Sequence, residues 1–254
     1  SNNHYAVFPS FSLGWNLTNE KFMERRPEWL TSTKVRFSWG KNGNENIGNF
    51  KYTVLTSTGN NYIFGAGEKV INGVKASGLA NPDLKWEESE QLDFGIDFGL
   101  LNNRVYATID AYKTWTSDLL LPMILPGHTG FTSVISNVGK TETRGIDLSI
   151  NTVNFDTKDF KWTTDLTFSA NKEKITALNT DQDDVGSGWF IGSPTSVIYD
   201  YEKIGIWQTN EATEAAKYGQ EPGDIKVRDL DKNGTIDSNN DRKVLGQLTP
   251  KWTA

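Results

Sequence analysis

Hydrophobic and polar residues alternate with a period of two along much of this chain. The pattern is clearest at the start, where Phe11, Leu13, Trp15 and Leu17 are separated by small or polar residues. Because successive side chains of a strand point to opposite faces, a period of two predicts a β-strand with one apolar face. The pattern recurs over residues 10–17, 34–39, 91–100, 105–112, 146–151 and 160–170. The sequence therefore predicts an all-β protein.

The connections between these segments alternate in length. Short connections occupy residues 19–33, 101–104 and 154–158, and long ones run over residues 41–87, 113–141 and 172–250. The pair Asn102-Asn103 suits a tight hairpin, because asparagine tolerates a positive φ. The stretch from Asn19 to Pro27 predicts one helical turn followed by a stop. Long structureless loops are uncommon in compact soluble domains, whereas tight turns at one end and long loops at the other are typical of outer-membrane barrels.

The polar positions of the predicted strands carry many charged residues. These are Asp93, Asp97, Asp110, Asp147, Lys161 and Asp165. A water-filled lumen accommodates such a face, and Trp15, Trp39, Trp115 and Trp162 suit the aromatic girdles of a membrane barrel. We therefore predict an antiparallel transmembrane β-barrel segment with long extracellular loops, forming an arc of a larger barrel. A soluble β-sandwich or jelly roll, whose strands also alternate, is the alternative that the pattern leaves open.

Composition excludes several other classes of protein. The chain has 254 residues, and none of its apolar runs approaches the roughly 18 residues that a membrane-spanning helix needs. A formal net charge of −6 argues against nucleic-acid binding, and an aromatic content of 12% argues against disorder. The absence of cysteine excludes disulfides and thiolate metal sites. No signal segment opens the chain at Ser1, so we expect any targeting sequence to have been removed or to lie outside it.

Short motifs follow one another in order along almost the whole chain. They are FPSFSLGW at residues 8–15, LTSTKVRFSWGKNG at 30–43, NPDLKWE at 81–87, FGIDF at 94–98, NNR at 102–104, TSDLLL at 116–121, GF at 130–131, NVG at 137–139, RGID at 144–147, GDIK at 223–226 and the loop at 229–246. Each motif is weak alone. The ordered set resembles the SusC/RagA family of TonB-dependent outer-membrane transporters.

The resemblance implies a barrel of about 22 strands with an N-terminal plug, in the outer membrane of a Gram-negative cell. It also implies transport energised through TonB, a SusD-like surface lipoprotein as partner, and oligosaccharides or peptides as cargo. We expect residues 1–254 to form a partial barrel region, without the plug, the TonB-contacting segment or the C-terminal closing strand. Residues 172–250 are expected to form a long extracellular loop. The lipid bilayer is then a further partner, and nucleic acid is not.

The acidic stretch at residues 229–241 has the spacing of a calcium-binding loop. Oxygen-bearing residues stand at its first, third, fifth and ninth positions, and Gly234 stands at the sixth. The predicted ligands are Asp229, Asp231, Asn233, Thr235 through its carbonyl, Asp237 and Asp241. The acidic residue usual at the twelfth position of such a loop comes one residue later, as Asp241, because Asn240 holds the twelfth position. No amphipathic helices flank the loop. We expect a structural Ca²⁺; the alternative is a cluster of Asx-turns that cap their own backbone without metal.

Aromatic residues precede this loop. Tyr199, Tyr201 and Trp207 are candidate substrate-binding residues, because their rings can stack on a sugar or a peptide. The alternative is that they pack this loop against its neighbour. Between them and the acidic stretch, residues 210–219 predict a short helix with Asn210 as N-cap and Gly219 as its left-handed end.

No catalytic constellation is apparent, and we predict that the chain is not an enzyme. His4 and His128 are far apart and lie in no catalytic or metal-binding motif. The carboxylates are numerous, but no pair stands out as a glycosidase pair would. Two functions follow: a component of an outer-membrane nutrient importer, or, as the alternative, a soluble Ca²⁺-stabilised β-sandwich that binds carbohydrate.

Overall fold

A computed structural model describes residues 5–44, 53–65, 69–250 and 252–253. The strands are β1 (Ser10–Asn16), β2 (Leu30–Asn44), β3 (Thr56–Phe64), β4 (Lys69–Ala76), β5 (Glu87–Leu100), β6 (Val105–Ser117), β7 (Leu120–Ile124), β8 (Ser133–Asn137), β9 (Gly139–Asp156), β10 (Lys161–Leu178), β11 (Val197–Tyr201), β12 (Lys203–Ile206), β13 (Ile225–Val227), β14 (Arg242–Gln247) and β15 (Trp252–Thr253). The helices are α1 (Ala212–Lys217) and the 3₁₀ turns η1 (Leu17–Asn19), η2 (Lys21–Met23), η3 (Gly127–Thr129) and η4 (Thr209–Glu211). Within these described ranges, no helix has the length and apolar character needed to cross a membrane.

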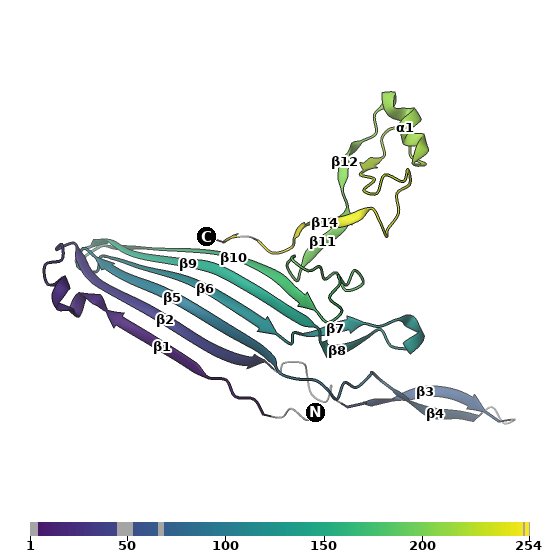
Figure 1. The fold of residues 1–254 in the computed structure, drawn as a ribbon, viewed down its shortest axis with the longest axis horizontal. Coiled ribbons are helices and arrows are strands. Elements are labelled where there is room, and N and C mark those ends of the chain that lie inside the picture. Colours follow the sequence, from purple (N-terminus) through teal and green to yellow (C-terminus); the bar gives the residue numbers. More distant parts are fainter. Residues whose placement is uncertain (1–4, 45–52, 66–68, 251, 254) are drawn as a thin grey trace. The chain divides into compact units, whose positions relative to one another are not determined.

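One antiparallel sheet dominates the first part of the chain (Figure 1). Its strands stand in the order β1-β2-β5-β6-β9-β10-β15, so each strand pairs with the next sheet strand along the chain. The six segments predicted from the period of two are all strands of this sheet, which confirms the all-β prediction. Several strands extend beyond the predicted limits; β9, for example, runs over Gly139–Asp156.

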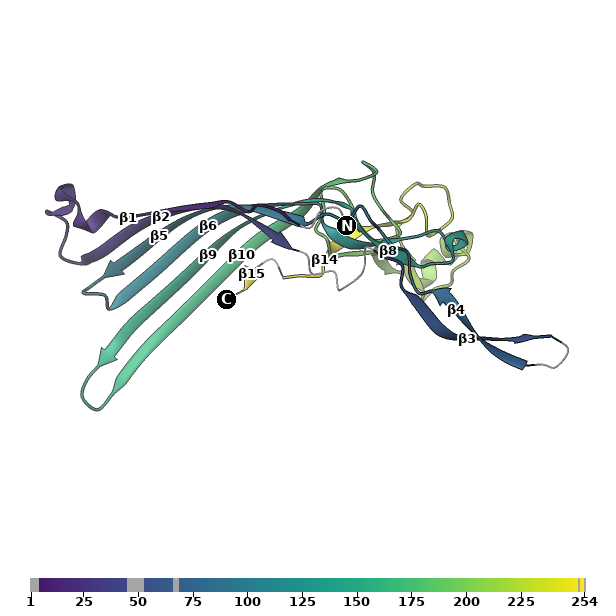
Figure 2. The ribbon, with the colours of Figure 1, turned by 90° about the horizontal axis from the view of Figure 1, so that it is seen from below.

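The connections at the two ends of the sheet differ in length, as predicted. Figure 2 shows the tight turns between β5 and β6 and between β9 and β10 at one end of the strands. In the first of these turns Leu101, Asn102 and Asn103 all have a positive φ, of 52°, 56° and 61°. The helical turn predicted between Asn19 and Pro27 is present as η2, and a further turn, η1, directly precedes it. The long connections all leave from the opposite end.

The long connections contain secondary structure that the sequence pattern predicted only as the helix at residues 210–219. The first carries the β3–β4 hairpin, the second carries the β7–β8 hairpin, and the third carries β11 to β14. The predicted start of the last loop is also too early. Because β10 continues to Leu178, residues 172–178 belong to the sheet.

The paired residues of the sheet form rows that are alternately apolar and polar. One row is Leu13, Phe37, Phe94, Ala111, Ile146, Ala170 and Trp252, and the adjacent row is Gly14, Arg36, Gly95, Asp110, Asp147 and Ser169. Paired residues share a face of a sheet, and successive residues of a strand lie on opposite faces. The sheet therefore has one apolar face and one polar face.

The apolar face is uncovered. Phe11, Phe94 and Trp162 are 57%, 44% and 51% exposed. A β-sandwich would enclose such side chains between two sheets, so the described part of the chain does not have the sandwich architecture.

Buried apolar side chains gather where the strands leave the sheet. Val138, Ile175, Leu178 and Trp189 form this cluster, and the half-buried Leu121 packs against it. The cluster ties the base of the β7–β8 hairpin to the end of β10.

Residues Pro194–Pro250 form a separate compact unit. Within it β11 pairs with β14 and β12 pairs with β13. The predicted helix is present as η4 followed by α1, and Gly219 ends it with a φ of +66°. The predicted cap is wrong, because Gln208 and Glu211 form a reciprocal capping box, which places Asn210 inside the first turn.

Candidate functional site

The charged residues predicted for the lumen share the polar face of the sheet. Arg36 is the centre of their network: its guanidinium donates to both carboxylate oxygens of Asp97, at 3.0 and 3.1 Å, and to Asp110 at 2.7 Å. Asp147 is paired directly with Asp110 and accepts a hydrogen bond of 2.5 Å from Ser169. An acidic, partly hydrated surface of this kind is what a water-filled lumen allows.

The predicted girdle tryptophans lie on the apolar face. Trp15, Trp115 and Trp162 are exposed there, and the indole N–H of the half-buried Trp39 donates to Glu90 at 2.8 Å. Near the tight-turn end, the ring of Phe155 stacks on that of Trp162, with centroids 5.9 Å apart. Aromatic rings at these positions fit the interfacial level of a membrane barrel.

Three carboxylates converge in the acidic loop of the second unit. Asp229, Asp231 and Asp241 each place an oxygen within 4.8 Å of the other two. Asp241 is fully buried and accepts hydrogen bonds from the backbone N–H groups of Leu230, at 2.7 Å, and Asp237, at 2.8 Å. Asp241 therefore holds both ends of the loop together.

One carboxylate oxygen of this cluster lacks a hydrogen-bond donor among the described residues. Asp229 accepts a hydrogen bond from the N–H of Gly234 at 2.9 Å through Oδ2, while its Oδ1 is buried and accepts no hydrogen bond from the described residues. A buried carboxylate oxygen without a donor is costly unless a cation or a proton compensates it. Since Ca²⁺ prefers carboxylate and carbonyl oxygens, the donor set fits that ion.

The structure does not bring all the predicted ligands together. Asp237 lies outside the cluster of three carboxylates, and its Oδ1 accepts from the N–H groups of Asn239 and Asn240 at 2.8 and 2.9 Å. The side-chain oxygen of Asn233 accepts from the backbone N–H of Thr235 at 2.8 Å. These are Asx-turns, so the metal-free arrangement considered as the alternative is present alongside the carboxylate cluster.

Backbone donors keep these carboxyl groups ionised. Desolvation acts to raise the pKa of Asp229, but hydrogen bonds from the backbone of Gly234 and Lys232 outweigh it and lower the pKa below its ordinary value. Hydrogen bonds from the backbone of Asn240 and Asn239 lower the pKa of Asp237. Both groups are therefore charged at neutral pH, as a cation site requires.

The aromatic candidates occupy different environments in this unit. Trp207 is 4% exposed, its indole N–H donates to Gln220 at 2.6 Å, and Lys226 Nζ lies 4.1 Å from its ring centroid. Trp207 therefore packs within its own unit in this structure, and its substrate-binding role stays a prediction. Tyr199 and Tyr201 are half-buried on β11, and their binding role stays a prediction.

His128 has no catalytic partner among the residues that the structure describes. His128 is exposed on η3, within the β7–β8 connection. His4 lies outside the described residues.

Sequence and structure comparisons agree on one family. Residues 1–244 match the family model described as TonB dependent receptor-like, beta-barrel. TonB-dependent receptor P3 of Formosa agariphila is 37% identical over 267 residues, which cover 99% of this chain and 26% of the relative. TonB-dependent receptor SusC of Bacteroides thetaiotaomicron is 32% identical over 244 residues, covering 93% of this chain and 24% of the relative.

The fold matches solved structures of the same kind. A chain of the RagAB peptide transporter superposes with a TM-score of 0.75 at 27% identity, covering 99% of this chain and 27% of that one. The RagAB peptide importer in its open-open state matches with a TM-score of 0.72 at 30% identity, covering 99% of this chain and 26% of that one. The chain thus spans about a quarter of the length of the proteins it matches.

Proposed function

The chain belongs to the TonB-dependent receptor-like β-barrel family and is of the SusC/RagA type, and on this premise we propose that it forms part of the wall of an outer-membrane nutrient importer. Transport would be driven through TonB and would involve a SusD-like surface lipoprotein. The cargo would be oligosaccharides or peptides; the matched RagAB structures are those of a peptide transporter and importer.

The observation that carries this proposal is the division of one sheet into an uncovered apolar face and a charged polar face. Apolar side chains such as Phe11 and Trp162 are exposed, and they are stable in that position only against lipid or another apolar surface. The opposite face holds the network of Arg36, Asp97 and Asp110, and water accommodates such charged groups at far lower cost than hydrocarbon does. A membrane wall with a wet lumen satisfies both requirements.

Extraction and co-purification of the full-length protein test this function. We expect it to appear in the detergent-solubilised outer membrane and to co-purify with a surface lipoprotein, and mass spectrometry of the native complex should identify that lipoprotein and any bound cargo. A protein that stays in the buffer-soluble fraction and binds carbohydrate there would instead support the alternative, a soluble Ca²⁺-stabilised module.

We further propose that the acidic loop binds Ca²⁺ in a structural role. Asp229, Asp231 and Asp241 would supply carboxylate oxygens. The buried Oδ1 of Asp229, which has no hydrogen-bond partner in the described part of the chain, supports this assignment. The carbonyl of Thr235 and the side chain of Asn233 are further candidates, whereas Asp237 is committed to its own turn. The ion would stiffen an exposed loop that has little apolar core.

Calcium should therefore stabilise this loop measurably. At a Ca²⁺ concentration about 100 times the dissociation constant, the stabilisation is about 2.7 kcal/mol. We expect chelation to lower the melting temperature of the full-length protein and to speed hydrogen exchange over residues 229–241. Asp231→Asn should weaken the response to Ca²⁺, while Asp224→Asn, outside the cluster, should not. An identical melting curve and exchange pattern with and without chelator would exclude the metal site.

A further inference from the structure

The apolar face of the sheet ends in a row of cations at the long-connection end of three strands. On β6, β9 and β10 the apolar positions give way to Lys113, Arg144 and Lys172, which are paired with one another across the sheet. On β1, β2 and β5 the same row consists of Phe11, Trp39 and Leu92. Strands of a membrane barrel are tilted by about 35–45°, so a row perpendicular to them changes depth as it crosses the sheet. The change from apolar to basic residues along this row marks where it leaves the hydrocarbon.

The cations of this row repel one another, and the described residues neutralise only part of that repulsion. Like charges directly opposite each other on neighbouring strands are destabilising. Glu142 lies 3.1 Å from the ammonium group of Lys113 and 3.3 Å from that of Lys174. Arg144 and Lys172 are exposed and directly paired, and within the described part of the chain neither forms an ion pair. An external anion would remove this repulsion.

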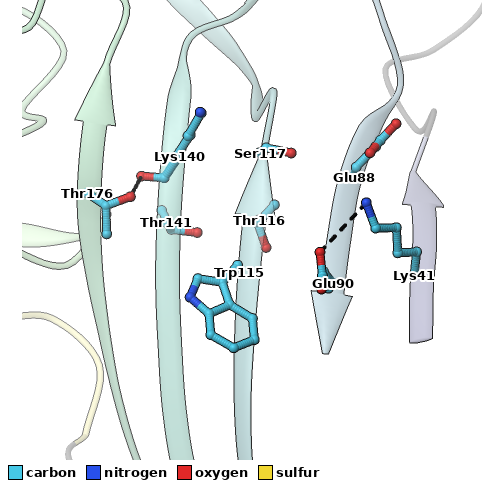
Figure 3. A pocket seen from close by; sticks show the side chains of 9 residues that line it. All are labelled: Lys41, Glu88, Glu90, Trp115, Thr116, Ser117, Lys140, Thr141 and Thr176. Atoms are coloured by element: carbon cyan, nitrogen blue, oxygen red, sulfur yellow. Dashed lines mark hydrogen bonds and ion pairs between the residues drawn. The ribbon is translucent and has the colours of Figure 1, made fainter. Parts of the chain in front are cut away.

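A shallow hollow lies beside the cation row, one step further toward the long connections. Lys41, Glu90 and Trp115 belong to the next row on the same face, and with Lys140 and Thr176 they line a hollow of about 120 Å³ (Figure 3). Lys113 also lies over the Trp115 ring, 4.7 Å from its centroid. Trp115 is paired across the sheet with Glu90 and Glu142 and lies beside Lys113 of its own strand. An aromatic ring among charged side chains fits the level at which lipid headgroups meet acyl chains.

We propose that Arg144 and Lys172, together with Lys113, bind the phosphate of a lipid headgroup in the leaflet at the long-connection end of the sheet. The proposal rests on the proposed function, because it requires the apolar face to lie in a membrane. Charge complementarity favours this occupant: the patch is basic on a chain whose formal net charge is −6, and it directly continues the apolar surface that acyl chains would cover. The headgroup phosphate neutralises the row while its acyl chains contact Phe94 and Ile146.

Lipid binding to the full-length protein in detergent tests this site. The probe is lipid A, titrated by native mass spectrometry against the wild type and the double variant Arg144→Gln/Lys172→Gln. Removal of two cations near an anionic lipid surface should weaken retention on the order of 10- to 30-fold. Dephosphorylated lipid A should bind both proteins equally weakly, and inorganic phosphate should not displace lipid A from the wild type. The matched control is Lys203→Gln/Lys217→Gln, which removes two cations from the separate unit and should retain lipid A as the wild type does.

Melting temperatures show whether the double variant is folded, so that a loss of lipid binding is not mistaken for a loss of folding. Without lipid A the double variant should melt at the same temperature as the wild type or higher, because repulsion has been removed, and lipid A should raise the melting temperature of the wild type alone. Equal retention of lipid A by both proteins, or its displacement by inorganic phosphate, would overturn the proposal. So would loss of the lipoprotein partner with lipid retention intact, since the row would then serve a protein contact. If the protein does not partition into the outer membrane at all, the proposed function itself fails.

Discussion

Arginine in place of Phe94 is expected to destabilise the protein in a bilayer by about 2–4 kcal/mol, the cost of a lipid-facing cation near the midplane of a membrane barrel. Phe94 lies on the apolar face, in the row between Phe37 and Ala111, and is 44% exposed there. In the membrane this exposed part contacts acyl chains, which cannot solvate a guanidinium group. The free energy of unfolding, measured by urea titration of the full-length protein in lipid vesicles, should fall accordingly.

The neighbouring residue provides a matched control. Asp93 lies on the polar face, opposite Tyr112, and interacts electrostatically with Asp110, Arg36 and Asp147. Asp93→Arg should be nearly silent, because the new cation enters an acidic, hydrated surface. The two variants introduce the same side chain at adjacent positions of one strand, on opposite faces of the sheet. Equal damage from both would mean that both faces are protein interior, and the membrane interpretation would be lost.

The strands of the large sheet were predictable because one face of such a sheet must be apolar where it meets lipid, which gives the sequence a period of two. An outward position in hydrocarbon must be apolar, so the alternation around Phe94 and Ile146 located β5 and β9. The same reasoning explains why the ends of the strands were missed. Toward the long connections the positions of the apolar face become charged, as at Arg144 and Lys172, while the backbone pairing of β9 and β10 continues. The pattern therefore reports the apolar part of each strand rather than its full length.

The sequence predicted less of the structure of the long connections and of the acidic loop. The β3–β4 and β7–β8 hairpins have no single apolar face, so their strands lack a clear period. The burial of Trp207 depends on Tyr218 and Lys226, which are distant in sequence. The spacing of the acidic residues predicted that Asp229 and Asp231 are ligands of one site, but it predicted Asp241 only as a last ligand one residue out of position. Its role as a buried acceptor for two backbone N–H groups is a tertiary property that no spacing rule contains.

Loss of the Asp241 carboxylate should be the most damaging single change in the acidic loop. Asp241→Ala removes the acceptor of both the Leu230 and the Asp237 N–H groups. Hydrogen bonds to charged groups contribute about 1.5–3 kcal/mol each, so we expect a loss on the order of 3–5 kcal/mol, confined to the second unit. Hydrogen exchange over residues 229–241 of the full-length protein, measured by mass spectrometry in the presence of chelator, should lose most of its protection.

Two further variants separate the anchoring role of Asp241 from metal binding. Asp241→Asn keeps one carbonyl oxygen as acceptor but turns an amide donor toward the other N–H, so its protection should lie between those of the wild type and Asp241→Ala. Asp231 is exposed, and among the described residues its carboxylate accepts hydrogen bonds from nearby Asn233, so Asp231→Ala should leave protection in chelator almost unchanged. If Asp231→Ala and Asp241→Ala were equally damaging without metal, the anchoring role would be wrong. If both lost only the protection that Ca²⁺ adds, both residues would act solely as ligands. The buried position of Asp241 between two backbone donors argues instead that the loop is assembled around this carboxylate before any ion binds.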